Sequence, residues 1–396
     1  MDPIATGAAA DPEAPPHTTQ LPEIDQYASS SQGPRNQDNA QTYNWPILDL
    51  LPSENSHQYY RICVPLYDAA LNGDWEKARG LIEGNQSMVR TAITEGYETA
   101  LQVATKAEKT GFALMIMEHM NEQDLTLQDR RGDTAFCFAV ATANRQLAEV
   151  MLSKNPDLAT LRGSGKMTPL NLAVLLGKED MAMFLYPQTG GLTPEERACI
   201  FFLSIKTDLY GMASELLLLP GELAVTRDMN GDTALHLLSR KHPSIFAGRD
   251  DQILDMKKGV CFLMLLLSQV TSQQNVDFKE LIRHPSNLLF DAARMGNLLL
   301  LSVIIRFYPD MVFELDENKR TIFHIAILHR QSSIFKLLHE LGYVRELIAT
   351  YVDAQKNTLL HMAAKHPDQS LASTAALKIQ QELQLFKVKL SHSSLS

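Results

Sequence analysis

A segment of eight residues recurs along the chain, and this recurrence constrains the fold more than any other feature. In each copy a Thr opens a short apolar run, with Leu or Phe two residues later and usually Ala five residues later. Six copies keep the Thr: Thr99, Thr134, Thr168, Thr233, Thr321 and Thr358. Because the motif repeats, we interpret it as a unit of architecture and not as a single functional site.

The spacing of the copies indicates the kind of repeat. Successive threonines are 35, 34, 65, 88 and 37 residues apart. Weaker copies at Val64 to Ala69 and Asn287 to Ala292 fill two gaps, and the copy expected at residues 196–229 keeps only a helical pattern. A period near ~33 residues with a Thr-Pro-Leu-His-like core is typical of ankyrin repeats. The sequence therefore predicts an all-α fold, an ankyrin-repeat solenoid of about nine helix-turn-helix repeats over residues 61–389.

Each position that recurs between the copies has a mechanical role. The Thr stands where its hydroxyl can cap unpaired N–H groups at the start of a helix. The Leu and Ala positions should face the neighbouring repeat, because a single helix pair cannot bury its own apolar face. Gly132 and Gly231 should supply the left-handed backbone angle of the turn before the Thr.

The first 60 residues differ from the rest in charge and composition. They hold eight Asp or Glu and one Arg, so they contribute −7 of the net charge of −10. Because they also hold eight of the 18 prolines and show no helical or strand periodicity, we expect residues 1–60 to be a disordered acidic tail. The remaining charge of −3 forms no basic stripe, which argues against direct nucleic-acid binding.

One apolar cluster, Tyr43 to Leu51, interrupts this tail. We expect the cluster to fold back and cover the first repeat. A short docking motif for another protein is the alternative.

An insertion over residues 241–285 interrupts the array: its first part splits the two helices of the sixth repeat, and its last part lengthens the connection to the seventh. Its first part, Lys241 to Asp255, is expected to protrude as a loop, and Gln269 to Ile282 to extend the connection. Insertions in repeat proteins map to loops on one face, often the binding face, so this loop is either functional or tolerated surface. At the other end, residues 374–389 form an amphipathic pattern that should cap the stack, before a polar tail at 390–396.

No metal or cofactor site is expected. His236, His324 and His361 occupy the same position in three repeats, and a spacing of about ~10 Å along a stack prevents two of them from sharing one metal ion. We expect them to bond to the loop backbone. The four cysteines form no Cys-x-x-Cys pair, which indicates a reducing compartment, and Cys63, Cys137 and Cys261 should pack in the core.

The sequence offers no recognisable catalytic motif, so we expect no catalytic residues. It has no phosphate-binding loop, nucleophile elbow, zinc-protease motif or kinase motif. Gly163 to Lys166 resembles a phosphate turn, but its position in the repeat favours a stretched interhelical loop. Met115, Met117 and Met120 are expected to pack in the core, with an adaptable binding face as the alternative.

Protein binding is the function that the repeat pattern favours, because loop tips of such arrays are exposed and variable. The candidate partner-binding residues lie at three of these tips: Arg130, Arg131, Met229, Asn230, Glu317, Asn318 and Lys319.

Three stretches carry a resemblance to a particular family. They are VPLYDAALNGDWEKARGLIE at 64–83, LFDAARMGN at 289–297 and AALKIQQELQLFKVK at 375–389. Together they resemble plant ankyrin proteins of the accelerated-cell-death type, whose C-terminal halves carry a PGG domain with membrane-spanning helices. The resemblance implies a role in plant stress, defence or cell-death signalling. It also implies that full-length relatives sit in the plasma membrane or another cell membrane, whereas the Pro-Gly-Gly tripeptide and those helices are missing here.

Three functions follow as hypotheses. The first is a non-catalytic scaffold that binds another protein, without nucleic acid or a small-molecule substrate. The alternative is a soluble decoy that pairs with membrane-anchored relatives, and an enzyme is the remaining hypothesis. The longest apolar stretches fall short of the ~20 residues that span a bilayer, so the sequence favours a cytoplasmic location.

Overall fold

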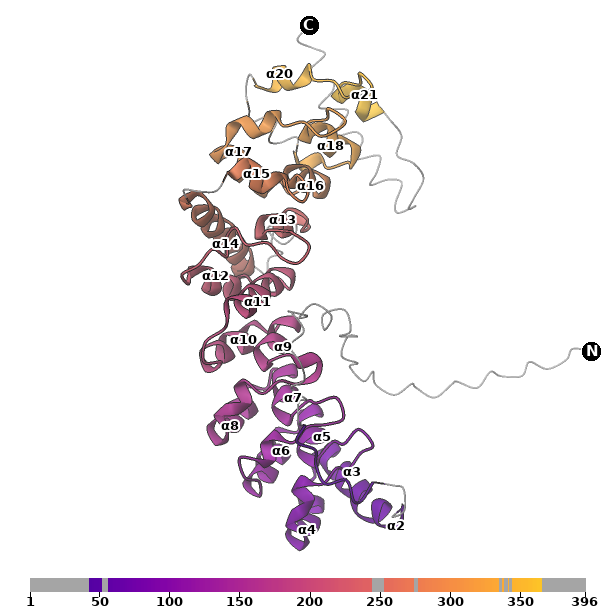
Figure 1. The fold of residues 1–396 in the computed structure, drawn as a ribbon. Helices are drawn as coiled ribbons and strands as arrows, with labels where there is room; N and C mark the ends of the chain where they lie inside the picture. Colours follow the sequence, from indigo (N-terminus) through magenta and orange to yellow (C-terminus); the bar gives the residue numbers. More distant parts are fainter. Residues whose placement is uncertain are drawn as a thin grey trace, which may run out of the picture.

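The computed structural model describes residues 43–51, 56–243, 253–273, 277–334 and 344–364, together with Leu337 and Leu341. Over these ranges the chain forms helices joined by short turns and loops, with two isolated β-bridges and no β-strand. The helices follow one another along an elongated column, with α3 and α4 towards one end and α20 and α21 at the other (Figure 1). The all-α class that the sequence predicts is confirmed for the described residues.

Most helices belong to two parallel rows. The first row consists of α3 (Val64–Asn72), α5 (Ala100–Lys106), α7 (Ala135–Ala141), α9 (Pro169–Leu175), α11 (Pro194–Lys206), α13 (Ala234–Ser239), α16 (Leu288–Met295), α18 (Ile322–Leu328) and α21 (Leu359–Ala364). The second row consists of α4 (Trp75–Gly84), α6 (Thr110–Glu118), α8 (Arg145–Lys154), α10 (Glu179–Leu185), α12 (Tyr210–Leu218), α14 (Ile253–Ser272) and α17 (Leu298–Phe307).

Shorter helical segments connect or extend these rows. They are α2 (Ser56–Gln58), α15 (Phe278–Arg283) and α20 (Val344–Ala349), the π-helical turn η1 (Tyr59–Cys63), and the 3-10 turns η2 (Gln86–Arg90), η3 (Asp124–Thr126), η4 (Pro156–Ala159), η5 (Ser164–Lys166), η6 (Tyr186–Gln188), η9 (Pro309–Phe313) and η10 (Ser332–Ile334).

The recurring Thr directly precedes six of the described first-row helices, namely α5, α7, α9, α13, α18 and α21. The hydroxyl of Thr99 accepts a hydrogen bond from the backbone N–H of Gln102, and Thr134, Thr168 and Thr321 each cap the residue three positions later in the same way. Capping satisfies donors that the first helical turn leaves unpaired. The capping role predicted for the Thr is therefore confirmed at these four positions.

A left-handed residue separates the two helices of a pair. Gly73, Gly177 and Gly296 adopt φ values of 75°, 68° and 75° there, which residues with a side chain resist. In other pairs Glu108, Ala143 and Asp208 take the same sign of φ. The tight turn is thus kept even where the sequence does not supply glycine.

The first-row helices form one uninterrupted contact series. Each of the nine described helices from α3 to α21 packs against the next member of its row. In the second row, α12 packs against both α10 and α14. Since the contacts run from neighbour to neighbour, the apolar core is a continuous strip along the column and not a central ball.

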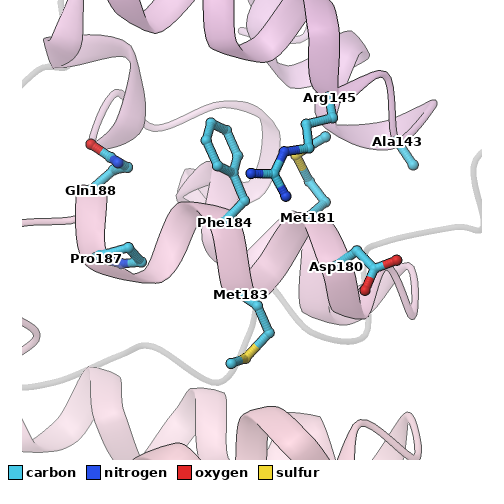
Figure 2. Close-up of a pocket in the computed structure, with 8 residues that line it drawn as sticks. All are labelled: Ala143, Arg145, Asp180, Met181, Met183, Phe184, Pro187 and Gln188. Carbon is cyan, nitrogen blue, oxygen red and sulfur yellow. The ribbon is translucent and has the colours of Figure 1, made fainter.

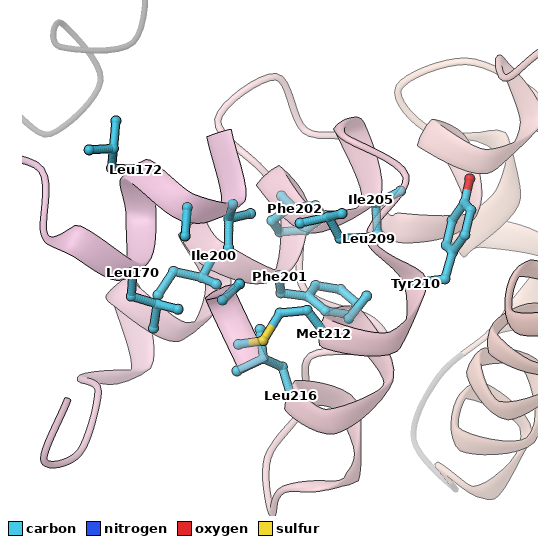
Figure 3. Packing of buried hydrophobic residues seen from close by; sticks show 14 of the residues in the cluster. Leu170, Leu172, Ile200, Phe201, Phe202, Ile205, Leu209, Tyr210, Met212 and Leu216 are labelled. Atoms are coloured by element: carbon cyan, nitrogen blue, oxygen red, sulfur yellow. The ribbon is translucent and has the colours of Figure 1, made fainter. Parts of the chain in front are cut away.

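Small residues let the first-row helices approach one another. Ala69, Ala104, Ala139, Ala173 and Ala326 occupy the same position in five copies and are fully buried. Larger side chains fill the space between the rows. Figure 3 shows this packing around Phe201 of α11, and the ring of Phe201 lies 6.1 Å from that of Phe262 on α14. The buried roles expected for the Leu and Ala positions are confirmed there.

The region of the insertion is largely helical where the structure describes it. Within it, α14 is a 20-residue helix that packs on α12, and α15 adds a further helix before the seventh pair. One face of α14 buries Phe262, Leu263, Leu266 and Leu267, which places Cys261 on the exposed face. The prediction that Cys261 packs in the core is therefore wrong, because the helical period turns it away.

The predicted start of the array at residue 61 also differs from the structure, in which helix begins at Ser56. Other predictions concern residues outside the described ranges. These are the disordered character of residues 1–42, most of the Lys241 to Asp255 loop, the capping pattern at 374–389 and the tail at 390–396. Among the helices that are described, none combines the length and hydrophobicity needed to cross a membrane.

Candidate protein-interaction surface

Four loops that precede first-row helices share one hydrogen-bonded framework. The loop before α7, the third helix of the first row, is called the third loop. In it, Asp129 Oδ1 accepts hydrogen bonds from the backbone N–H groups of Arg131 and Asp133, both at 2.9 Å. The carboxylates at positions 228, 316 and 353 accept the equivalent pair of N–H groups at 2.7 to 3.0 Å. Gly132 and Gly231 have positive φ in their loops, as predicted. The Asp side chain therefore holds each loop in shape from within.

The side chains at the loop tips are left on the surface. All seven residues that the sequence singles out are exposed: Arg130, Arg131, Met229, Asn230, Glu317, Asn318 and Lys319. They do not converge on one patch, because they belong to the loops before α7, α13 and α18. The sequence-predicted residues thus define three places along one edge of the column.

Neighbouring loops are joined by backbone hydrogen bonds. The N–H of Arg130 donates to Gly96 O in the preceding loop, at 2.8 Å, and the N–H of Ala354 donates to Asn318 O, at 2.8 Å. In addition, the guanidinium of Arg130 lies 5.9 Å from the centre of the Tyr97 ring. Adjacent tips are therefore held in fixed relation to each other, which a shared binding surface requires.

The segment Tyr43 to Leu51 lies against these loops. It contacts the end of the first repeat at Arg90 to Ala92, in the loop before α5, and it also contacts the loop before α7. Ile47 forms a parallel bridge with Thr91, and Asn44 exchanges hydrogen bonds with Gln128. The apolar composition of the segment signalled a contact, but nothing local in the sequence identified its partner loops.

In the sixth copy of the motif, the recurring His bonds to loop backbone, as expected. His236 is fully buried, and its Nδ1 accepts from the N–H of Thr233 at 3.3 Å. Because Nε2 lies 3.0 Å from the carbonyl oxygen of Ser286, that nitrogen carries the proton. Burial lowers the pKa of His236 and likewise that of His324, so both rings are held neutral.

Gln102 replaces the His in the second copy. Its Oε1 accepts from the N–H of Thr99 at 2.7 Å, while Nε2 donates to the carbonyls of Leu127 and Asp133, each at 3.1 Å. An amide therefore makes the same link from helix cap to neighbouring loop. The shared role of His and Gln is structural, because neither needs a charge to perform it.

An ion-pair network joins the sixth unit to the seventh, and the sequence did not reveal it. Arg240 Nη1 lies 2.6 Å from Asp232 Oδ2, and Arg240 Nε lies 3.1 Å from Asp291 Oδ2. Arg294 and Ser286 also contact the Asp291 carboxylate. Both carboxylates are buried, so the network compensates charges that would otherwise be costly to desolvate.

A surface hollow lies between α8 and α10 (Figure 2). Its volume is about 720 Å³, and it is lined by Ala143, Arg145, Asp180, Met181, Met183, Phe184, Pro187 and Gln188. The Arg145 guanidinium stacks over the Phe184 ring at 4.8 Å, which closes one side. The hollow combines one stacked cation with apolar walls and the carboxylate of Asp180.

The remaining candidate groups are structural. Burial raises the pKa of the Cys63 thiol to about 11 and that of Cys137 to about 12, which makes both thiols unreactive. Gly163 to Lys166 forms a turn whose Ser164 N–H donates to Asp133 Oδ1 at 2.8 Å, so the donor expected of a phosphate turn is occupied. Among the described residues, no group of three or more His, Cys, Asp or Glu side chains is arranged to hold a metal ion.

The methionine cluster divides between core and surface. Met117 and Met120 are buried, as expected for core packing, and Met115 on the same helix is exposed.

Comparisons with known proteins give no family: no family model matches the sequence, and no curated protein is significantly similar to it.

Proposed function

We propose that this chain is a non-catalytic ankyrin-repeat scaffold that binds another protein through its loop tips. Three features support the ankyrin assignment: the Thr-capped first helix, the left-handed turn to the second helix, and the Asp-stabilised loop before the next Thr. The continuous first row from α3 to α21 agrees with about nine such units.

The binding role rests on one observation: Asp side chains hold the loop backbone, whereas the side chains at the loop tips are exposed. Asp129, Asp228 and Asp316 satisfy the backbone N–H groups of their turns from inside. The loops therefore keep their shape without using the tip side chains. Such side chains are free to vary and to contact a partner, as on other rigid scaffolds that present loops.

The positive charge at the tip of the third loop indicates which chemical groups a partner would present there. Arg130 and Arg131 are adjacent, exposed and held at a fixed position by the bond to Gly96. Two arginines presented together favour a partner with carboxylate groups at the contact, since guanidinium and carboxylate match in charge and geometry.

We further propose that the chain is a PGG-family relative that acts in plant stress, defence or cell-death signalling. The support is the resemblance of residues 64–83 and 289–297, which span α3 with α4 and most of α16 with the turn that follows. The third resembling stretch, 375–389, lies outside the described residues.

The test is affinity capture from plant extract with the full chain and with a variant that carries Arg130→Glu and Arg131→Glu. The loop backbone does not depend on either side chain, so the variant should fold normally. We expect at least one partner to be lost from the captured set, by tenfold or more. That loss corresponds to ~1.4 kcal/mol of binding free energy.

The matched control carries Arg79→Glu and Arg306→Glu, which change the net charge equally on α4 and α17. Both side chains are exposed and lie away from the loop tips. If both double variants retain the same partners as the unmodified chain, binding through the third loop is refuted.

A further inference from the structure

The segment Tyr43 to Leu51, here called the strap, is bound across two loops by its backbone. The N–H of Ile47 donates to Arg90 O at 2.8 Å, and the N–H of Ala92 donates to Ile47 O at 2.9 Å. Three residues earlier, the N–H of Gln128 donates to Asn44 O at 2.9 Å. Backbone pairing of this kind recognises an extended conformation without depending on side-chain identity.

Side chains add selectivity at the start of the strap. Asn44 Nδ2 donates to Thr126 Oγ1 at 2.7 Å, and the N–H of Asn44 donates to Gln128 Oε1 at 3.2 Å. Trp45 stacks on Tyr43 with ring centres 4.9 Å apart, and its edge meets the Tyr97 ring at 5.6 Å.

The third loop is shaped to receive the first aromatic residue. A Cβ at Gly132 would lie 2.8 Å from Tyr43 Cε1, so the glycine lets the ring approach the loop closely. Pro46 is buried between the two loops, and its ring favours the extended backbone that the bonds require. The surface therefore fits an aromatic-Asn-aromatic-Pro-aliphatic sequence.

The strap leaves one side exposed, although Pro46 is buried and Leu50 packs against the core. Tyr43, Trp45 and Ile47 keep 41%, 39% and 37% of their surface exposed, unlike the fully buried positions of the column. Only residues 52–55 separate the strap from α2, and a short tether gives an effective concentration of about 1 mM. An isolated peptide with a dissociation constant near ~100 µM would therefore still occupy the surface almost fully in cis.

We propose that the loops at residues 90–97 and 126–132 form a docking site for an extended peptide of this aromatic-Asn-aromatic-Pro-aliphatic chemistry, and that the strap occupies the site as a competitor in cis. The site includes the loop that carries Arg130 and Arg131, so the inference deepens the proposed function. A partner that binds there in extended form must displace the strap, which makes the strap autoinhibitory.

The experiment uses the full chain with a recognition sequence for a specific protease inserted between Leu51 and Ser56. A fluorescent peptide of residues 41–51 is titrated before cleavage, and again after cleavage and gel filtration. We expect the N-terminal fragment to leave and the cleaved chain to bind the peptide at least tenfold more tightly than the uncleaved chain. Fluorescence anisotropy measures both affinities.

Two matched variants test where the peptide binds. Thr126→Val removes the hydroxyl that accepts from Asn44 and should weaken peptide binding by the cleaved chain about fivefold. Thr226→Val is the control, because Thr226 Oγ1 likewise donates to a nearby backbone carbonyl, that of Glu222, but lies in the loop region before α13. Trp45→Ala in the uncleaved chain should weaken the strap and admit the peptide without any cleavage.

Three results would overturn the inference. One is a fragment that stays bound through gel filtration, which would make the strap a permanent part of the fold. The second is equal peptide affinity before and after cleavage. The third is an equal effect of the Thr126 and Thr226 variants. Because no partner protein is used, these outcomes are independent of the capture experiment with Arg130 and Arg131.

Discussion

Asp129 offers the sharpest test of how the loops are stabilised. Its carboxylate is 4% exposed and accepts two backbone hydrogen bonds. Burial raises the pKa of Asp129 to about 6, and those bonds only partly oppose the shift. The equivalent Asp316 differs by one neighbour, since Arg320 lies 2.7 Å from its carboxylate.

The sign of the pH effect follows from linkage. The folded-state pKa of Asp129 is above the ordinary value of 3.8, so the folded chain binds this proton more tightly than the unfolded chain. The contribution of Asp129 to stability is therefore smallest above pH 7 and increases as the pH falls through 6. Between pH 7.5 and pH 5 the increase is about 1.4 kcal/mol.

The perturbation is Asp129→Asn. The amide keeps an oxygen that can accept from both loop N–H groups, but it cannot ionise. At pH 7.5 the loss of charge-assisted hydrogen bonding opposes the relief of the desolvation penalty, so the net change there should be within about 1 kcal/mol. At pH 5 the variant should lose about 1.4 kcal/mol relative to the unmodified chain, because it lacks the protonation gain.

Tryptophan fluorescence during urea unfolding is a suitable assay. The chain has two Trp residues: Trp75 packs against Phe112 in the first two helix pairs, and Trp45 lies in the strap. Fluorescence therefore reports the units around Asp129. The difference between the two proteins at each pH cancels the contribution of other titrating groups.

If the Asp129→Asn chain gains as much stability between pH 7.5 and pH 5 as the unmodified chain, protonation of Asp129 does not stabilise the fold. Asp316→Asn, followed by circular dichroism, is the comparison. It removes the charge that pairs with Arg320 and should destabilise the chain by about 1 kcal/mol at pH 7.5.

Three further predictions concern the links between units. His236→Gln should fold normally, because Gln102 already fills this position in the second unit. The variant should lose less stability below pH 6.5, because the pKa of the buried His236 is lowered; urea unfolding from pH 7.5 to 5 checks this. Thr321→Val should cost about 1 kcal/mol through the lost cap, seen as a lower urea midpoint. Arg240→Met should cost ~2 kcal/mol by leaving Asp232 and Asp291 less compensated, and adding Asp232→Asn should recover part of that loss in the same assay.

Local features were predictable because their partners lie within one turn of chain. Thr99 caps Gln102 three residues later, and Gly132 completes a loop begun by Asp129. The repeated spacing also predicted the buried Ala series. The prediction for Cys261 was wrong, because the apolar run around it did not show which face of the long helix α14 is buried.

Long-range contacts were not predictable from local pattern. The sequence predicted that His236 would bond to a loop, but its acceptor is Ser286, 50 residues later and beyond the insertion. Arg240 likewise pairs with Asp291, 51 residues later in the sequence. These partners depend on where α14 and α15 pack between the sixth and seventh units, and no short-range sequence pattern specifies that packing.

The sequence by itself determined the units of this protein: which residues begin a helix, which turn the chain, and which face a neighbour. Only the tertiary structure decided what the loops carry, including the strap across the loops before α5 and α7. The physical reason is the range of the interactions. Caps and turns form within a few residues, whereas Asn44 contacts Gln128 only after the two intervening helix pairs have stacked and brought their loops into one row.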